Sequence, residues 1–507
     1  MRSLTVRAVL FKSIGELIPL YALYALLFAD HGMSTGQISL LFAIWSATSF
    51  LLEVPSGAWA DTVSRRGLLV LSGVLLTAGF ALWTVAPSFA GFAAGFVLWG
   101  ISGALASGTF EALLYDDLAA RAASSAYPRV LGYTRAGAET AVVIAILAAT
   151  PLYLYGGYVL VGWFSVAMAA VHTLLALSLP TAPKAVSAAD VDALEEEDSS
   201  ARPSAPVDDP VAVVDDPVAA VGNPVAAVGN PVAVGGNPVA VGGDPTAVGG
   251  DSTAVGGDST AVGGDPTAVG GDPTVVGGNS IASGFASKVD PKRSTPVSGP
   301  FARYLTMLKA GVGEAVRVRA VRYGVLLEAL LFGVTAFDEY FALLAEESGV
   351  STAVVPLLVG LTVLGSLTGS VLAGRTEGMS GRTMSIAVAA AGVLFLGGAL
   401  IAGLATGHPD AVYLLSGLGF GSIGISYGIV YNAGIVAAAR LQDAIDGPAR
   451  ATVTSVSGLL GEVIALTVFA FAALTTQHTS ISTLLALLGA SLLAIAALTP
   501  RWLPPAD

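Results

Sequence analysis

Apolar residues along the chain gather in runs long enough to cross a lipid bilayer, and short polar joints separate these runs. A membrane-spanning helix needs about 20 mostly apolar residues. The windows that meet this length cover residues 8–29, 37–58, 67–87, 91–114, 131–153 and 157–180, then 323–345, 352–374, 384–406, 411–438, 452–475 and 480–499. The pattern therefore predicts an all-α membrane protein with twelve transmembrane helices (spans 1 to 12), arranged as two pseudo-symmetric six-helix bundles.

Composition supports a bilayer as the solvent of this chain. Apolar residues make up 54% of the sequence and charged residues only 12%, whereas soluble domains carry about 25% charged residues. The chain has no Cys, which excludes disulfides, thiolate metal sites and cysteine nucleophiles. Its four His occur singly, so we expect no metal centre and no cofactor.

The Lys and Arg residues predict the orientation of the helices. Loops on the cytoplasmic side of a membrane collect Lys and Arg. If the N-terminus lies inside, the inner joints hold Arg121, Arg129, Arg440 and Arg501 among others, and the outer joints hold no Lys or Arg. We therefore expect a multi-pass protein of the cell membrane with both termini in the cytoplasm.

The segment from 183 to 300 differs in kind from the rest of the chain. Residues 183–295 contain 16 of the 36 acidic residues and 5 of the 23 basic ones, so most of the net charge of −13 belongs to this segment. From Asp209 to Gly278 a seven-residue unit rich in Pro, Gly and Asp recurs. Pro and paired Gly exclude a helix, and the units lack bulky side chains for a core. We predict a disordered cytoplasmic linker between bundles at 1–182 and 301–507, with a ligand-binding repeat as the alternative.

Acidic residues inside the predicted spans are candidates for function. An ionisable group in hydrocarbon is costly, so it usually faces a protein interior or a wet cavity. Glu16, Glu139 and Glu462 lie at similar depths in spans 1, 5 and 11. A desolvated carboxyl takes up a proton readily, so these three are candidates for proton coupling. The alternative is a buried Glu that is hydrogen-bonded between helices.

The charged residues also indicate which helices face lipid. Spans 3, 9 and 12 contain no charged residue, and span 6 contains only His172. The charge-free helices are thus every third one. We expect them to occupy the lipid-facing positions of a fold built from repeats of three helices.

The joint after span 2 carries a motif with Gly57, Asp61, Arg65 and Arg66. It resembles the signature of the major facilitator superfamily between helices 2 and 3. Gly57 allows close helix packing, Asp61 can interact with a neighbouring helix N-terminus, and the two Arg hold the joint inside. We expect one of these Arg to pair with Asp116 or its neighbour Asp117 at the end of span 4, as part of an inner gate.

A weaker copy of this motif follows span 8, with Arg375 and Arg382. Arg440, Asp443 and Arg450 after span 10 resemble the inner-gate residues of the family. The alternative for these three residues is plain anchoring on the cytoplasmic side. The resemblance covers all twelve helices and implies alternating-access transport. The chain is similar to the branch of the superfamily that exports drugs and other small molecules. It departs from the drug–proton antiporters of that branch, because span 4 lacks an Arg and span 5 lacks a Gly-Pro-rich stretch.

Polar residues in spans 5 and 10 complete the candidate site. Arg135 lies four residues before Glu139, so both share one helical face and we expect a structural pair. Tyr427, Tyr431 and Asn432 in span 10 are candidates to line a cavity for a small molecule, or equally to tie helices together by hydrogen bonds.

These features predict a secondary active transporter of a small organic solute, with proton-coupled efflux as the favoured mode. A nutrient uptake permease of the same fold and a non-transporting scaffold or sensor are the alternatives. We do not expect an enzyme, because the sequence shows no catalytic or phosphate-binding constellation. The expected partners are the solute, protons and the lipid bilayer, without nucleic acid, and the expected oligomeric state is a monomer.

Overall fold

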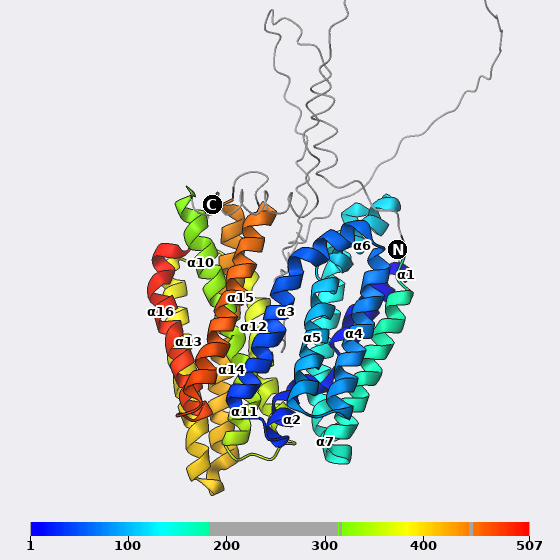
Figure 1. Cartoon of the computed structure of the whole chain (residues 1–507). Coiled ribbons are helices and arrows are strands. Elements are labelled where there is room, and N and C mark those ends of the chain that lie inside the picture. The colour runs from blue at the N-terminus through cyan, green and yellow to red at the C-terminus, as the bar shows by residue number, and fades with distance from the viewer. Residues whose placement is uncertain (1, 182–312, 314–316, 446–449, 506–507) are drawn as a thin grey trace, which may run out of the picture. The chain divides into compact units, whose positions relative to one another are not determined.

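The structure is a computed structural model that describes residues 2–181, 313, 317–445 and 450–505 (Figure 1). The side chains of residues 53–55, 57, 58, 60–62, 450–452 and 455 lie outside this description as well. The described ranges contain helices and no strand. The expected linker, 183–300, lies outside the described residues.

The first half of the chain consists of six spans, two of which are interrupted. Its elements are α1 (Arg2–Glu16), η1 (Pro19–Ala22), α2 (Tyr24–Asp30), α3 (Thr35–Thr62), α4 (Arg65–Val85), α5 (Phe89–Ala106), α6 (Thr109–Ala120), η2 (Ser124–Ala126) and α7 (Tyr127–Leu177). Between α5 and α6, Gly108 adopts a φ of 67°, a conformation that glycine tolerates without steric cost. Span 4, predicted as one helix, is therefore divided at this glycine.

The second half repeats the pattern of six spans. Its elements are α10 (Arg319–Gly333), η3 (Val334–Tyr340), α11 (Phe341–Glu347), α12 (Val355–Thr376), α13 (Gly381–Leu404), η4 (Ala405–Gly407), η5 (Pro409–Ala411), α14 (Val412–Asp443), α15 (Arg450–Thr475) and α16 (Ile481–Trp502). In Figure 1 the labels N and C lie at the same end of the helices, as an even number of spans requires.

The count of spans depends on one glycine pair. Eleven helical segments of the described residues are long and apolar enough to cross a membrane. One of them contains α7, in which Gly156 and Gly157 leave the helical conformation and Gly157 has a φ of 58°. The chain reverses there, so α7 comprises spans 5 and 6. The prediction of twelve transmembrane helices is thereby confirmed, with the fifth joint reduced to two residues.

Serine residues define where many of the helices begin. Ser34 caps α3 by accepting from the Gln37 backbone N–H at 3.3 Å, and the Gln37 side chain accepts from the Ser34 N–H at 2.9 Å. Such a reciprocal cap satisfies two backbone donors that a helix start leaves free. Serine caps also begin α4, α5, α13 and α16, at Ser64, Ser88, Ser380 and Ser480.

Packing between the two halves is concentrated on two helix pairs. The contacts join α3 to α15 and α7 to α12, that is spans 2 and 11 and spans 5 and 8. The charge-free spans 3, 9 and 12 (α4, α13 and α16) pack mainly within their own halves and expose apolar side chains such as Leu71, Ile386 and Leu487. Their placement agrees with the expected lipid-facing position.

Helices α12 and α14 approach each other through glycine. A Cβ added to Gly365 would collide with the backbone carbonyl of Gly424, and one added to Gly369 would collide with that of Gly428. Small residues allow such backbone contact between membrane helices, where dispersion and polar contacts replace the hydrophobic effect. The second half is therefore built around this pair of helices.

We expect the substitution Gly369→Ala to destabilise the protein by about 1–3 kcal/mol, because its methyl group must displace a backbone carbonyl. Gly421→Ala on α14 is the matched control, since nothing lies within 4 Å of its added Cβ. Alanine has a higher helix propensity than glycine at both positions. A loss of stability in Gly369→Ala alone therefore reports the packing between α12 and α14. Thermal unfolding of the purified variants in detergent checks this, and a Gly369→Ala protein as stable as wild type would contradict it.

Candidate functional site

Spans 1 and 7, which occupy equivalent places in the two halves, are both interrupted near their middle. In span 1, α1 ends at Glu16, Ile18 is extended (φ −116°, ψ 92°), and Pro19 starts the short turn η1. In span 7, the 3₁₀ segment η3 separates α10 from α11. A pair of broken helices in corresponding positions of two halves is the best structural pointer to a transport site.

Tyrosine and carboxyl groups meet between these two breaks. The Tyr24 hydroxyl at the start of α2 donates to Glu339 Oε2 of η3, in the other half of the chain. The Tyr427 hydroxyl of α14 donates to Asp338 Oδ2 at 2.5 Å. The Tyr340 hydroxyl donates to Ser39 Oγ of α3 at 2.8 Å. Three consecutive residues of η3 thus fix the break of span 7 against its surroundings.

Asp338 and Glu339 are buried, with exposed fractions of 5% and 3%. A position near the outer end of a predicted span would by itself place both carboxyls in a hydrated interface, whereas the structure places them inside the protein. The reason is η3, which carries both side chains into the protein. Beside them lies a cavity of about 10 Å³ that Tyr21, Tyr24 and Val359 also line.

Glu16 and Glu139, the first two predicted coupling residues, lie close to each other. Helix α1 packs on α7, where an added Cβ at Gly137 would come within 2.5 Å of Ser13 Oγ. Glu139 is 9% exposed and interacts electrostatically with Glu16, and its Oε2 has no hydrogen-bond partner among the described residues. Arg135 is half-buried one turn before Glu139, and its pairing with Glu139 stays a prediction.

Glu462, the third predicted coupling residue, accepts a hydrogen bond from the Ser46 hydroxyl at 2.6 Å. Ser46 lies on α3 and Glu462 on α15, so this bond joins the two halves. The contact matches the alternative that the sequence left open, a carboxyl that links helices through a hydroxyl. A role in coupling stays a prediction for Glu462.

The three polar residues of span 10 divide into two roles. Asn432 ties α14 to α12, since its Nδ2 donates to the Gly369 carbonyl at 2.9 Å and its Oδ1 accepts from the Thr376 hydroxyl at 3.0 Å. Tyr427 reaches Asp338 and lies 3.4 Å from the Tyr431 hydroxyl. The tyrosines therefore belong to the central site, whereas Asn432 holds helices together.

The motif after span 2, which the sequence predicts to be part of an inner gate, contains an ion pair with a buried carboxylate. Arg65 pairs with Asp116, and its Nη1 also donates to the Ala112 carbonyl at 3.3 Å. Arg66 Nη1 donates to the Leu179 carbonyl at 3.5 Å. The expectation that one Arg of the motif pairs with an acidic residue at the end of span 4 holds for Arg65 and Asp116. The predicted roles of the Gly57, Asp61 and Arg450 side chains lie outside the described residues.

The second copy of the motif uses a different arginine. Arg375 and Arg382 are exposed. Arg440 is 5% exposed and donates to the backbone carbonyls of Glu377, Met379 and Pro504, at 2.5, 3.0 and 3.3 Å for the shortest bond to each. From the sequence, Arg440 resembled an inner-gate residue, with plain cytoplasmic anchoring as the alternative. Its buried position on α14 makes it the residue that closes the joint between α12 and α13.

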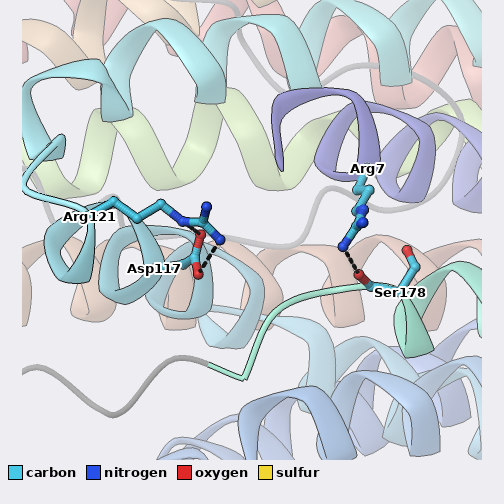
Figure 2. Close-up of polar contacts among 4 residues, drawn as sticks. All are labelled: Arg7, Asp117, Arg121 and Ser178. Carbon is cyan, nitrogen blue, oxygen red and sulfur yellow. Dashed lines mark hydrogen bonds and ion pairs between the residues drawn. The ribbon is translucent and has the colours of Figure 1, made fainter. Parts of the chain in front are cut away.

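Other charged contacts secure the same end of the first half. Figure 2 shows Arg121 on Asp117, with Nε to Oδ2 at 2.6 Å, and Arg7 donating to the Ser178 carbonyl at 3.0 Å. Lys12 lies 4.0 Å from Glu111. These contacts lie near helix ends, whereas Asp338 and Glu339 have no Lys or Arg ion pair among the described residues.

Two six-span halves, with facing broken helices and buried carboxyls between them, define a multi-pass membrane protein with a central polar site. The chain belongs to the major facilitator superfamily, whose family model, described as Major Facilitator Superfamily, matches residues 8–463. A search of curated proteins with this chain gave no match.

Solved structures of transporters share the fold. A D-xylose–proton symporter is similar over 99% of this chain and 98% of that chain, with a TM-score of 0.57 and 14% identity. A mutant of a nucleoside transporter matches over 98% of this chain and 99% of that chain, with a TM-score of 0.59 and 9% identity. Another structure of that transporter, over 98% of each chain, has a TM-score of 0.53 and 10% identity. At these identities the likeness shows the fold alone.

We expect Arg65→Ala to cost about 3–5 kcal/mol, because it leaves the buried Asp116 carboxylate without its counter-charge. Arg382→Ala is the control, since that side chain is exposed in the second copy of the motif and its loss should leave the stability close to that of wild type. The double variant Arg65→Ala with Asp116→Ala should recover part of the loss. Unfolding in detergent measures all three, and equal effects of the two arginine variants would refute the assignment.

Proposed function

We propose that this protein is a secondary active transporter of a small organic solute, with coupling to protons and alternating access between the two halves. The observation that carries this proposal is the pair of broken helices, spans 1 and 7, which meet through Tyr24 and Glu339. Non-helical backbone at membrane depth is tolerated only inside protein or around a cavity. Membership of the major facilitator superfamily supports transport as the role of such a site.

The chemistry beside the breaks favours a cationic or amphipathic solute. Tyr21 stacks on Trp99 with ring centroids 5.1 Å apart and planes at 9°, and Trp45 lies 5.0 Å from Trp99. Aromatic faces attract organic cations, and the buried carboxyls of the site would complement their charge. Strongly anionic solutes are disfavoured by the same carboxyls.

Cross-half hydrogen bonds indicate how access alternates. Besides Tyr24 with Glu339, the Tyr340 hydroxyl donates to Ser39, and the Thr150 hydroxyl donates to the Ala353 carbonyl at 2.8 Å. All of these residues lie on the side of the site away from the chain termini, in α2, α3, α7 and the segments around α11. We propose that they form the outer gate, and that rocking of the halves breaks them.

Proton coupling is assigned to Glu16 and Glu139. The two carboxyls interact electrostatically within one half, and like charges at short range disfavour simultaneous ionisation. One of them would therefore hold a proton in the conformation described, and solute binding or opening to water would release it. Glu139 Oε2, which has no hydrogen-bond partner among the described residues, is the atom best placed to carry that proton.

The direction of transport and the cellular location are proposed from the sequence. The sorting of Lys and Arg supports a cell-membrane protein with both termini in the cytoplasm. We propose efflux as the direction, on the resemblance to exporting members of the family. Uptake is the alternative, and the solved neighbours include a sugar–proton symporter. Accumulation of a labelled solute in everted rather than right-side-out vesicles separates the two directions.

We expect Glu16→Gln and Glu139→Gln to abolish uphill, proton-driven transport while leaving exchange of solute across proteoliposomes, because a neutral amide cannot release a proton. The measurement is a panel of organic cations in proteoliposomes, with and without a pH gradient. Asp410→Asn, at an exposed joint position, is the control and should transport as wild type does. Full activity with unchanged pH dependence in both variants would show that the coupling residues lie elsewhere.

We expect deletion of residues 205–285 to leave the transport rate within about twofold of wild type, because no residue of the central site lies in that segment. Transport in proteoliposomes at equal protein density measures this. Loss of transport with normal insertion in the membrane would favour the scaffold or sensor hypothesis, in which the repeat segment is the functional part.

A further inference from the structure

Two oxygen atoms of η3 are buried without a partner. Asp338 Oδ1 and Glu339 Oε1 have no hydrogen-bond donor among the described residues, although both side chains are more than nine-tenths buried. The second oxygen of each carboxyl accepts from a tyrosine, Tyr427 for Asp338 and Tyr24 for Glu339. Buried polar atoms are nearly always paired, so these two oxygens point to a group that they would hold.

Charge leads to the same conclusion. Adjacent buried carboxyls repel each other when both are ionised, and the described residues supply no Lys or Arg ion pair to either. The titratable groups near them are tyrosines, namely Tyr21, Tyr24, Tyr340, Tyr427 and Tyr431. Two of these tyrosines also interact electrostatically with the other carboxyl pair, Tyr21 with Glu16 and Tyr431 with Glu139. None of these groups brings a positive charge, so the pair can stay buried only if it takes up a proton or binds a cation.

The adjoining cavity sets the size of that cation. It measures about 10 Å³ and is lined by Asp338 and Glu339 from one half and by Tyr21 and Tyr24 from the other. A volume of about 10–15 Å³ holds a single water molecule. Hydrated Mg²⁺ and Ca²⁺ with six to eight oxygen ligands do not fit, whereas a small singly charged cation does.

We propose that Asp338 and Glu339 form a binding site for one monovalent cation, a proton or Na⁺, held between the two halves against Tyr24. The site is separate from the Glu16 and Glu139 pair of the first half. It extends the proposed function, because an ion that bridges the breaks of spans 1 and 7 is placed to couple to closure of the gate. Its existence does not require that any particular solute is transported.

The test measures ion binding to the purified full-length protein in detergent. Tryptophan fluorescence reports the site, because Trp83 and Trp99 lie 5.8 and 6.3 Å from the Tyr24 ring. NaCl replaces choline chloride at constant ionic strength and fixed pH, and a pH titration in choline chloride forms the second arm. A saturable response to Na⁺ assigns the site to sodium, and a response to pH alone assigns it to the proton.

In Glu339→Gln and Asp338→Asn we expect the midpoint of that response to move by about tenfold or more, equivalent to about 1.4 kcal/mol. Glu346→Gln, an exposed carboxyl on α11 of the same span, is the matched control and should keep the wild-type midpoint. If a charge variant does not purify, Tyr24→Phe removes only the hydroxyl that donates to Glu339 and should also shift the midpoint, without changing the charge of the site. Ion-dependent melting temperature is the second readout.

Two results would overturn the proposal. The first is wild-type protein whose fluorescence and melting temperature respond to neither Na⁺ nor pH. The second is an unchanged midpoint in the Glu339→Gln, Asp338→Asn or Tyr24→Phe protein. Because no solute is present, these outcomes are distinct from a failure of the proposed transport, which the vesicle and proteoliposome assays measure.

Discussion

In hydrocarbon every backbone N–H and C=O must find a partner within the protein, and the two broken spans satisfy this constraint with side chains from neighbouring segments. At the break of span 1, the Leu20 N–H donates to Ser165 Oγ of α7 at 3.1 Å, in a buried position. At the break of span 7, the Thr335 hydroxyl donates to the Phe332 carbonyl at 2.6 Å. Neither break could face lipid, so both must lie inside the protein, where the two halves meet.

The breaks also determine where charge can be buried. A regular helix through residues 334–340 would spread their side chains around its axis, whereas η3 places Asp338, Glu339 and Tyr340 against three different partners. The remaining charges of the described protein lie mostly at helix ends, where Arg65 and Arg440 fix the joints. The two kinds of contact thus lie at different depths along the helices. Ion pairs that fix the joints lie at one end, and the carboxyl–tyrosine contacts of the candidate site lie at the centre.

The sequence predicted the spans well because a bilayer imposes one length and one polarity on each helix. It also singled out Glu16 and Glu139 as candidates for coupling, since a lone carboxyl in an apolar run is conspicuous, and that role stays a prediction. The burial of Asp338 and Glu339 does not follow from the sequence, because linear distance from a span end suggests an interface when the backbone in between is regular. Tyr24 was not singled out at all, as tyrosine near a span end is ordinary.

The pseudo-symmetry of the two halves stops at the chemistry of the breaks, and this asymmetry bears on the proposed cycle. To the cavity between the breaks, span 1 contributes Tyr21 and Tyr24, whereas span 7 contributes Asp338 and Glu339. Tyr427 and Asp338 belong to the same half, so rocking of the halves leaves their hydrogen bond intact. Tyr24 and Glu339 belong to different halves, so the same motion separates them. Of the two carboxyls, Glu339 is therefore the one whose surroundings change with access, and an ion shared by both would lose its cross-half contacts as the outer gate opens.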